Sequence, residues 1–251
     1  MSSQWIKELR YFKEIDSTQD YAFSCIRNGD IKENTVITSE VQKKGRGRRS
    51  NAWISPKGGL WLSLVIVSEI SQGKLPLLGI GMCLAIIKAI KKKTKIKTMF
   101  HWPNDIYVGN EKLAGILSET ETQSGKAKFI IIGAGINTNL GTKDFPEDTK
   151  ATSIKIKTGS TIDNLELLNE ILEQYSRIYS VIVKDGLKPV LKKEIMNNFD
   201  LNGKTVCINN DNKNIACGKL IGIDDTGALL LQEDTGEIKK IMSGHMEEKK
   251  K

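Results

Sequence analysis

The spacing of apolar residues divides the chain into stretches typical of strands and stretches typical of helices. Strands are predicted where short apolar stretches end at glycine, proline or polar turns: Leu9–Ile15, Thr35–Val41, Gly59–Val67, Ile96–Trp102, Ile106–Val108, Lys112–Glu119 and Lys128–Gly135. Helices are predicted where apolar residues recur every three or four positions: 17–27, Leu75–Lys93, Leu165–Val183 and Leu187–Asn198. Asp16 or Ser17 offers a cap for the first helix. The hairpins predicted in the middle of the chain argue against a purely parallel sheet.

Past Gly203 the pattern changes to short strands separated by tight turns. These strands are Thr205–Asn209, Ile215–Ile223, Ala228–Gln232 and Glu237–Met242. We therefore expect an α+β protein of two domains. Residues 1–200 would form a mixed, largely antiparallel sheet with flanking helices, and residues 201–246 a small C-terminal β-barrel. Residues 247–251 are expected to form a charged, frayed tail.

The composition of the 251-residue chain excludes several classes of protein. A hydrophobic content of 39% is sufficient for a core, and the absence of a long apolar run argues against a transmembrane helix. The first residues lack the basic and apolar regions of a signal peptide. None of the four cysteines (Cys25, Cys83, Cys207 and Cys217) forms a Cys-x-x-Cys pair, so neither a zinc site nor a disulfide framework is expected. A reducing cytoplasm is the simplest location.

The net charge of +8 is exceeded by two clusters of basic residues alone. The segment Lys43–Arg49 holds five cations and two glycines, and Trp53 lies four positions beyond it. Because like charges this dense repel, the segment is expected to be mobile when empty and ordered by an anion. On spacing alone, a nucleic-acid patch and a phosphate clamp made of arginine forks remain equally open. The second cluster, Lys88–Lys97, ends a predicted helix and is interpreted as a solvated face.

Three further motifs place polar or glycine residues at strand ends. In His101–Asp105, Asn104 can hydrogen-bond a ligand and Asp105 can orient a metal or a donor, although turn formation explains both residues as readily. Lys112–Leu117 opens with a lysine, a compact charge suited to a phosphate or a carboxylate. Gly133–Asn137 lacks the third glycine of a dinucleotide fingerprint, so a Rossmann site is rejected. Its glycines permit close approach of a ligand, and its asparagine can contact a purine edge.

Taken in order, these motifs resemble the biotin–protein ligase (biotin–[acetyl-CoA-carboxylase] ligase) family. The residues that carry the resemblance are Asp16–Thr18, Gln42, Gly45–Arg49, Trp53, Trp102–Asp105, Lys112–Leu117, Gly133–Asn137 and Gly227–Leu231. The resemblance covers essentially the whole chain and is to the short form, which lacks the N-terminal DNA-binding domain of dual-function members. It implies a class II synthetase-like catalytic domain, use of ATP and Mg²⁺, and a biotin carboxyl carrier protein as partner. Family members are often homodimers, and no specific DNA binding or membrane association is expected.

The resemblance also implies roles for individual residues. Biotin would be held by Ser17, Thr18, Gln19, Gln42, Gly45, Arg46, Gly47, Arg48, Lys112 and Gly115. ATP would be held by Arg49, Trp53, Asn104, Gly135 and Asn137. Catalysis would rest on Lys112, Arg46 and Arg48, with Asp105 as a candidate proton acceptor, while the metal ligands stay undetermined.

Three departures from the family pattern bear on these roles. Gln19 stands where the family usually has Asn, Ser50-Asn51 replaces a usual Gly-Arg, and His101 replaces a usual Lys. The first concerns a biotin contact, and the other two concern the nucleotide and phosphate side. None of them removes a group that the chemistry requires.

Three alternative functions remain open at this stage. A lipoate or octanoate ligase has a similar fold, although the arginine–glycine segment together with Trp102–Asp105 favours biotin. A nucleic-acid-binding module would use the basic clusters, but it leaves Trp102–Asp105 and Lys112 unexplained. An inactive binding protein is the third alternative, to which the three departures give some support.

Overall fold

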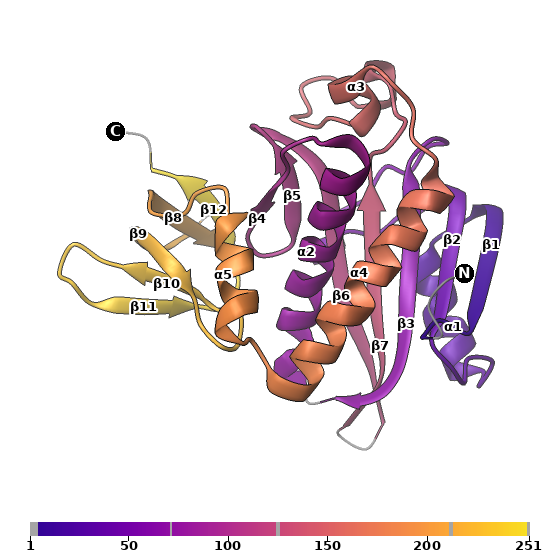
Figure 1. Ribbon diagram of the computed structural model, residues 1–251, viewed down its shortest axis with the longest axis horizontal. Coiled ribbons are helices and arrows are strands. Elements are labelled where there is room, and N and C mark those ends of the chain that lie inside the picture. The colour runs from indigo at the N-terminus through magenta and orange to yellow at the C-terminus, as the bar shows by residue number, and fades with distance from the viewer. Residues whose placement is uncertain (1–4, 71, 124–125, 211–212, 250–251) are drawn as a thin grey trace.

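Seven strands form one mixed sheet in the computed structural model, which describes residues 5–70, 72–123, 126–210 and 213–249 (Figure 1). The strands are β1 (Glu8–Ile15), β2 (Thr35–Gln42), β3 (Leu60–Ile70), β4 (Met99–His101), β5 (Asp105–Val108), β6 (Glu111–Gln123) and β7 (Lys126–Ile136). They lie in the order β1-β2-β3-β7-β6-β5-β4. β1 and β2 run parallel, and each of the other neighbouring pairs runs antiparallel. The expected mixed, largely antiparallel sheet is confirmed.

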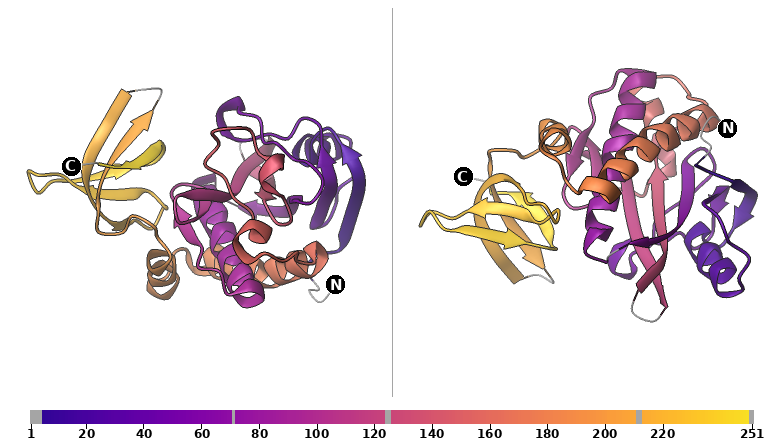
Figure 2. Two further views of the ribbon diagram at one scale, coloured as in Figure 1. Left: turned by 90° about the horizontal axis from the view of Figure 1, so that it is seen from above. Right: turned by 60° about the horizontal axis from the view of Figure 1, so that its bottom comes forward.

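Helices cover both faces of this sheet. α2 (Leu75–Thr94) and α4 (Asn164–Asp185) pack together on one face, and α1 (Thr18–Arg27) lies on the other (Figures 1 and 2). The alternation of side chains along a strand divides the core accordingly. In β3, Leu64 and Ile66 belong to the cluster beneath α2 and α4, whereas Val65 belongs to the cluster beneath α1. Because residues two positions apart share a face, Ser63 and Val65 both point to the α1 side.

α2 is the central helix of the larger core, and 13 of its 20 residues are buried. Its C-terminal lysines, interpreted from the sequence as a solvated face, form ion pairs with neighbouring helices. Lys92 Nζ lies 2.7 Å from a Glu170 carboxylate oxygen of α4, and Lys88 Nζ lies 2.7 Å from Glu194 of α5 (Pro189–Asn197). Lys91, Lys92 and Lys93 remain exposed, as expected, while two lysines of the cluster also pair with carboxylates of α4 and α5.

A second, five-stranded sheet follows α5 and lies beside the β4 end of the molecule (Figure 2). Its strands are β8 (Thr205–Asn210), β9 (Lys213–Ile223), β10 (Leu229–Gln232), β11 (Ile238–Ile241) and β12 (His245–Glu248). The order is β11-β10-β9-β8-β12, and all pairs are antiparallel. Among the residues described, no pairing joins β11 to β12, so the sheet is open and not the closed barrel that was expected. β12 also includes Glu247 and Glu248, which were expected to belong to the frayed tail.

A disulfide between Cys207 and Cys217 crosses this second sheet. The two residues lie directly opposite each other on β8 and β9, with their Cα atoms 4.1 Å apart. The expectation of no disulfide is wrong because it rested on sequence spacing, whereas hairpin pairing brings residues ten positions apart face to face. The argument for a reducing compartment from cysteine usage loses its basis. Cys25 and Cys83 are free and buried.

Two local elements escaped the sequence pattern because they are shorter than a period-based argument can resolve. A one-turn helix, α3 (Ile154–Thr158), is capped by Ser153, whose Oγ accepts a hydrogen bond from the Ile156 amide. A 3₁₀ turn over Arg48–Ser50 bends the basic segment. Within the ranges that the structure describes, no helix combines the length and the apolar character needed to span a membrane.

Candidate functional site

A cavity of about 610 Å³ opens on the α1 side of the main sheet. Its walls come from the N-terminus of α1, the basic segment, strands β3, β5, β6 and β7, the loop 145–151 and the turn before β12. The volume lies in the range of small-molecule pockets, roughly 300–1,000 Å³. Every residue that the sequence assigned to biotin, ATP or catalysis lines this cavity except Gly45. The strand register thus gathers residues that lie more than a hundred positions apart.

Gly45 does not line the cavity, but the backbone course of the basic segment (Lys43–Arg49) requires a glycine at this position. A Cβ at this position would lie 2.4 Å from the Trp53 carbonyl oxygen and 2.6 Å from Ser55 Oγ. The segment closes on itself there, because the Trp53 amide donates to the Gly45 carbonyl at 2.8 Å and the Gly47 amide donates to the Asn51 carbonyl at 2.7 Å. The expected mobility of the empty segment stays a prediction.

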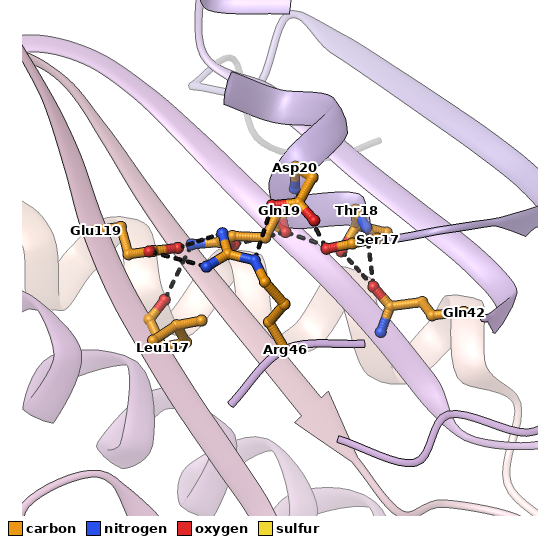
Figure 3. Close-up of polar contacts among 9 residues, drawn as sticks. Ser17, Thr18, Gln19, Asp20, Gln42, Arg46, Leu117 and Glu119 are labelled. Atoms are coloured by element: carbon orange, nitrogen blue, oxygen red, sulfur yellow. Dashed lines mark hydrogen bonds and ion pairs between the residues drawn. The ribbon is translucent and has the colours of Figure 1, made fainter. Parts of the chain in front are cut away.

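The floor of the cavity is a hydrogen-bonded polar cluster at the start of α1 (Figure 3). The backbone amide and Oγ1 of Thr18 both donate to Gln42 Oε1, at 2.9 and 3.0 Å. Ser63 Oγ lies 2.9 Å from Thr18 Oγ1 and donates to Gln19 Oε1 at 2.8 Å. Ser17 caps the helix by accepting from the Asp20 amide. Fixed donors and acceptors in a nearly buried floor favour a small ligand with its own polar end.

Gln19, the first departure from the family pattern, fits because of a glycine opposite it. A Cβ on Gly133 would lie 2.7 Å from Gln19 Oε1. With that space empty, the longer side chain reaches across β7 and donates from Nε2 to the Leu117 carbonyl of β6 at 3.4 Å. The Gln19 side chain therefore joins α1 to the sheet as part of the floor and is 4% exposed.

The Trp53 indole packs directly against the backbone of Gly115 and Gly135, which we call the glycine seat. A Cβ on Gly135 would come within 2.3 Å of the indole Nε1, and one on Gly115 within 2.9 Å of the ring carbon Cζ3. The Lys112 ammonium stands 5.2 Å from the centre of the same ring, within cation–π range. The seat brings the aromatic ring and the lysine to the same wall of the cavity.

The charged groups of the cavity are concentrated around Lys112. Its Nζ lies 2.7 Å from Asp105 Oδ2, while Asp105 Oδ1 is buried without a hydrogen-bond partner. Arg48 donates to Asn104 Oδ1 at 2.8 Å, and Asn104 in turn donates to the Ile116 carbonyl. Burial lowers the pKa of Arg48, opposed by the nearby Asp105 carboxylate. Two cations and one carboxylate thus face the space where an anionic ligand would lie.

Arg46 lines the cavity edge, but it is engaged by protein carboxylates. It donates to both oxygens of Glu119, at 3.1 and 2.8 Å, and its Nε lies 2.8 Å from Asp20 Oδ1 without hydrogen-bond alignment. Burial works against the charged guanidinium, but Glu119 and Asp20 outweigh it and raise the pKa of Arg46. Arg49 hydrogen-bonds Asn210 of β8 and so links the basic segment to the second sheet.

The second sheet reaches the cavity through His245, next to His101 and Tyr107. His101, the third departure, contacts Asp200 Oδ2 at 2.5 Å through Nδ1 and the Met246 carbonyl of β12 at 3.1 Å through Nε2. Its ring lies against that of Tyr107, with the centroids 4.7 Å apart and the ring planes tilted by 39°. Burial, together with the Asp105 and Asp200 carboxylates, raises the pKa of Tyr107 to about 12. The phenol therefore stays neutral near pH 7.

Several lining residues were not anticipated from the sequence. They are Ser63, Tyr107, Phe145, Pro146, Thr149, Lys150, Ala151, Gly244 and His245. Ser63 carries a usable signal, because a serine inside an otherwise apolar strand marks a polar site on one face. The loop and the β12 turn carry none, since their position depends on tertiary contacts such as the Lys112 amide donating to the Lys150 carbonyl at 2.9 Å. Among the described residues, no group of three metal-binding side chains is present.

Two family profiles match this chain. Residues 11–137 match the biotin/lipoate A/B protein ligase family, and residues 203–247 match the biotin protein ligase C-terminal domain. The first match covers the cavity floor, the basic segment, Trp53, Lys112 and both glycines of the seat. The chain belongs to the biotin/lipoate A/B protein ligase family.

The chain's likeness is to the biotin–protein ligases of this family, as the sequence motifs indicated. It is 34% identical over 244 residues to the bifunctional ligase/repressor BirA of Bacillus subtilis, covering 96% of this chain and 74% of the relative. It is 33% identical over 236 residues to BirA of Escherichia coli, covering 92% and 71%. The Aquifex aeolicus biotin protein ligase in complex with biotin and ATP superposes with a TM-score of 0.83, at 29% identity, over 98% of this chain and 100% of that one. The resemblance is confirmed.

Proposed function

We propose that the chain joins biotin to a lysine of a biotin carboxyl carrier protein, in two steps at this cavity. One observation carries the assignment: Lys112, Arg48 and Asp105 converge above a polar floor built from Thr18 and Gln19. Family membership and the likeness to a ligase that binds biotin and ATP supply the substrates. The carrier protein as acceptor and the residue roles below belong to the proposal.

In the first step, a biotin carboxylate oxygen attacks the α-phosphorus of ATP. The new C–O–P linkage of biotinyl-5′-AMP forms while the bond to the β-phosphate breaks and pyrophosphate leaves. No base is needed, because a carboxylic acid with a pKa of about 4 is ionised at neutral pH. The obstacle is repulsion between two anions, which Lys112 and Arg48 offset. Loss of one such cation should cost about 3 kcal/mol, or on the order of 10²-fold in rate.

In the second step, the carrier lysine attacks the acyl carbon, the bond to AMP breaks and the amide forms. A lysine with a pKa of about 10.4 must first lose its proton, which costs roughly 4.6 kcal/mol at pH 7. Asp105 is the one carboxylate among the described lining residues, and its Oδ1 has no partner. We assign the proton acceptor to this oxygen. The basic segment and Trp53 would meanwhile keep water from the adenylate.

Mg²⁺ would enter with ATP as the metal complex of the substrate. This ion usually keeps several waters and binds through one or two carboxylates together with substrate phosphates. Asp105 would hold the ion in the first step, before its unpartnered Oδ1 serves as proton acceptor in the second, and the ion would add positive charge near the phosphates. Homodimer formation, the absence of specific DNA binding and a cytoplasmic location stay predictions, the last because the reaction draws on ATP.

Incubation with ATP, Mg²⁺ and biotin, followed by mass measurement of the bound ligand, tests the function. The expected result is a biotinyl-5′-AMP adduct that transfers its acyl group to a purified carrier domain. Parallel incubations with lipoic and octanoic acids address the alternative ligases, and a preference for either acid overturns the assignment to biotin. Lys112→Ala should lower pyrophosphate release by about 10²-fold or more. Lys13→Ala, an exposed lysine of β1, should match the unmodified protein.

A further inference from the structure

Three charged side chains from three elements meet beside the cavity floor (Figure 3). Arg46 comes from the basic segment, Asp20 from the first turn of α1 and Glu119 from β6. Both terminal nitrogens of the Arg46 guanidinium donate to Glu119, and Nε faces Asp20 at 2.8 Å. We call Arg46, Asp20 and Glu119 the loop latch. It connects the basic segment to both neighbouring walls at once.

The charges of the loop latch do not suit a direct contact with an anionic substrate. One guanidinium faces two carboxylates, so the cluster carries a net negative charge. The Arg46 and Glu119 side chains are 34% and 28% exposed, which leaves their bidentate pair only partly screened by water. A phosphate approaching Arg46 would also approach Asp20 and Glu119. Arg48, by contrast, donates to the neutral amide of Asn104.

The position of the loop latch ties it to the biotin end of the cavity. Asp20 directly follows Gln19, and Glu119 lies two residues beyond Leu117 on β6. Gln19 and Leu117 are themselves joined by a hydrogen bond across the floor. The loop latch therefore joins α1 to β6, as the Gln19–Leu117 hydrogen bond of the floor does. Its carboxylates lie one and two positions farther along these two elements.

The backbone around Arg46 transmits this anchoring to the rest of the segment. Gly45 accepts from the Trp53 amide at 2.8 Å, and Gly47 donates to the Asn51 carbonyl at 2.7 Å. Arg46 itself forms a β-bridge with Ala52. A fixed Arg46 side chain thus holds Trp53 over its glycine seat. The stretch from Arg48 to Ser50 turns in a 3₁₀ bend, and its two arginines donate to the neutral side chains of Asn104 and Asn210 rather than to carboxylates.

We propose that Arg46 is a positioning residue and not a ligand of the phosphate, and that Asp20 and Glu119 are the residues through which it acts. The loop latch closes the biotin end of the basic segment, while Arg48 is left to meet the phosphate. This inference rests on the proposed function for its catalytic consequences, but the loop latch itself is a property of the chain without substrates.

Site-resolved trypsin digestion of the ligand-free protein tests the loop latch without relying on activity. Cleavage should be faster after Arg48 and Arg49 than after Arg46, and Glu119→Gln should accelerate cleavage after Arg46 by about 10-fold. Glu14→Gln is the matched control, because it removes a Lys43 ion pair of the same segment whose side chains are 54% and 57% exposed. Equal cleavage after Arg46 in the Glu119→Gln variant and the unmodified protein overturns the inference.

Kinetics distinguish positioning from direct contact. Glu119→Gln and Asp20→Asn should raise the KM for biotin and speed release of biotinyl-5′-AMP by about 10-fold, while kcat for pyrophosphate release changes less than about twofold. Arg46→Ala combined with Glu119→Gln should be no worse than Arg46→Ala alone. Additive losses, or a fall in kcat confined to Arg46→Ala, would make Arg46 a direct ligand. If the unmodified protein forms no adenylate, the proposed function fails, and the digestion pattern still decides on the loop latch.

Discussion

Gly115 of β6 and Gly135 of β7 face each other across the antiparallel ladder, and the indole of Trp53 lies over both. Neither position has a side chain to hold the ring away from the backbone. The aromatic ring therefore approaches the sheet as closely as the strands allow, next to the Lys112 ammonium. Two glycines at one rung of the sheet thus determine how deep the cavity is at this point.

Gly135→Ala should weaken ATP binding, because the new Cβ would meet the indole Nε1 at 2.3 Å and displace Trp53. Overpacking of this kind costs about 1–3 kcal/mol, so an affinity loss of about 10-fold or more is expected. Isothermal titration with ATP measures this affinity. Gly141→Ala is the control, since its Cβ would lie 3.6 Å from the nearest Asp144 atom. Equal affinity of the two variants for the ligand would contradict the proposed dependence of the cavity on Trp53 packing against Gly135.

The interpretation of His101 extends this reasoning to the nucleotide side. Its contacts with Asp200 and the Met246 carbonyl place β12, and with it His245, at the cavity wall. His101→Ala should raise the KM for ATP by about 10-fold, the equivalent of one lost charge-assisted hydrogen bond. The KM for biotin should change less than about twofold, because the floor lies on the other side of the cavity. Steady-state pyrophosphate release measures both constants.

His101→Lys separates the Asp200 contact from the ring contact with Tyr107. Lysine, usual at this position in the family that the motifs resemble, can also contact Asp200 but has no ring to lie against Tyr107. The variant should retain an ATP KM within about threefold of the unmodified protein if the Asp200 contact dominates. An ATP KM as high as that of His101→Ala would assign the effect to the ring contact with Tyr107 instead. Unchanged constants in both variants would remove His101 from the placement of β12.

The sequence was informative wherever a function depends on a short local motif. The helix cap at Asp16 or Ser17, the cation-rich segment and Lys112 were all identified, because their residue types carry the chemistry in themselves. The position of Trp53 over Gly115 and Gly135 could not be predicted, since it depends on strand register. The same holds for the Cys207–Cys217 pair and for β12, whose partners are set by the folding of the second sheet. The spacing of residues along the chain does not show which strands pair, and each of these features depends on that pairing.

Cysteine labelling should reveal the Cys207–Cys217 bond directly. The denatured, unreduced chain should take up two alkyl groups, at Cys25 and Cys83, and the reduced chain four, as counted by mass. A link closing ten residues of chain should contribute about 2–3 kcal/mol to the free energy of unfolding. Cys207→Ser combined with Cys217→Ser should therefore lower the urea midpoint without reductant. Four alkyl groups without reductant would contradict the bond.

Asp224, in the turn before β10, should make the second sheet sensitive to acid. Burial alone would raise its pKa, but hydrogen bonds from Thr226 and Ala228, together with Lys240, lower it from 3.8 to about 2. Because the folded pKa lies below the unfolded one, this stabilisation is complete above about pH 4 and is lost as the pH falls toward 2. Asp224→Asn should cost about 2 kcal/mol of unfolding free energy at pH 7 and almost nothing at pH 2. Asp225→Asn, at a side chain 85% exposed, is the control, and urea titrations at both pH values that showed a constant difference would contradict the assignment.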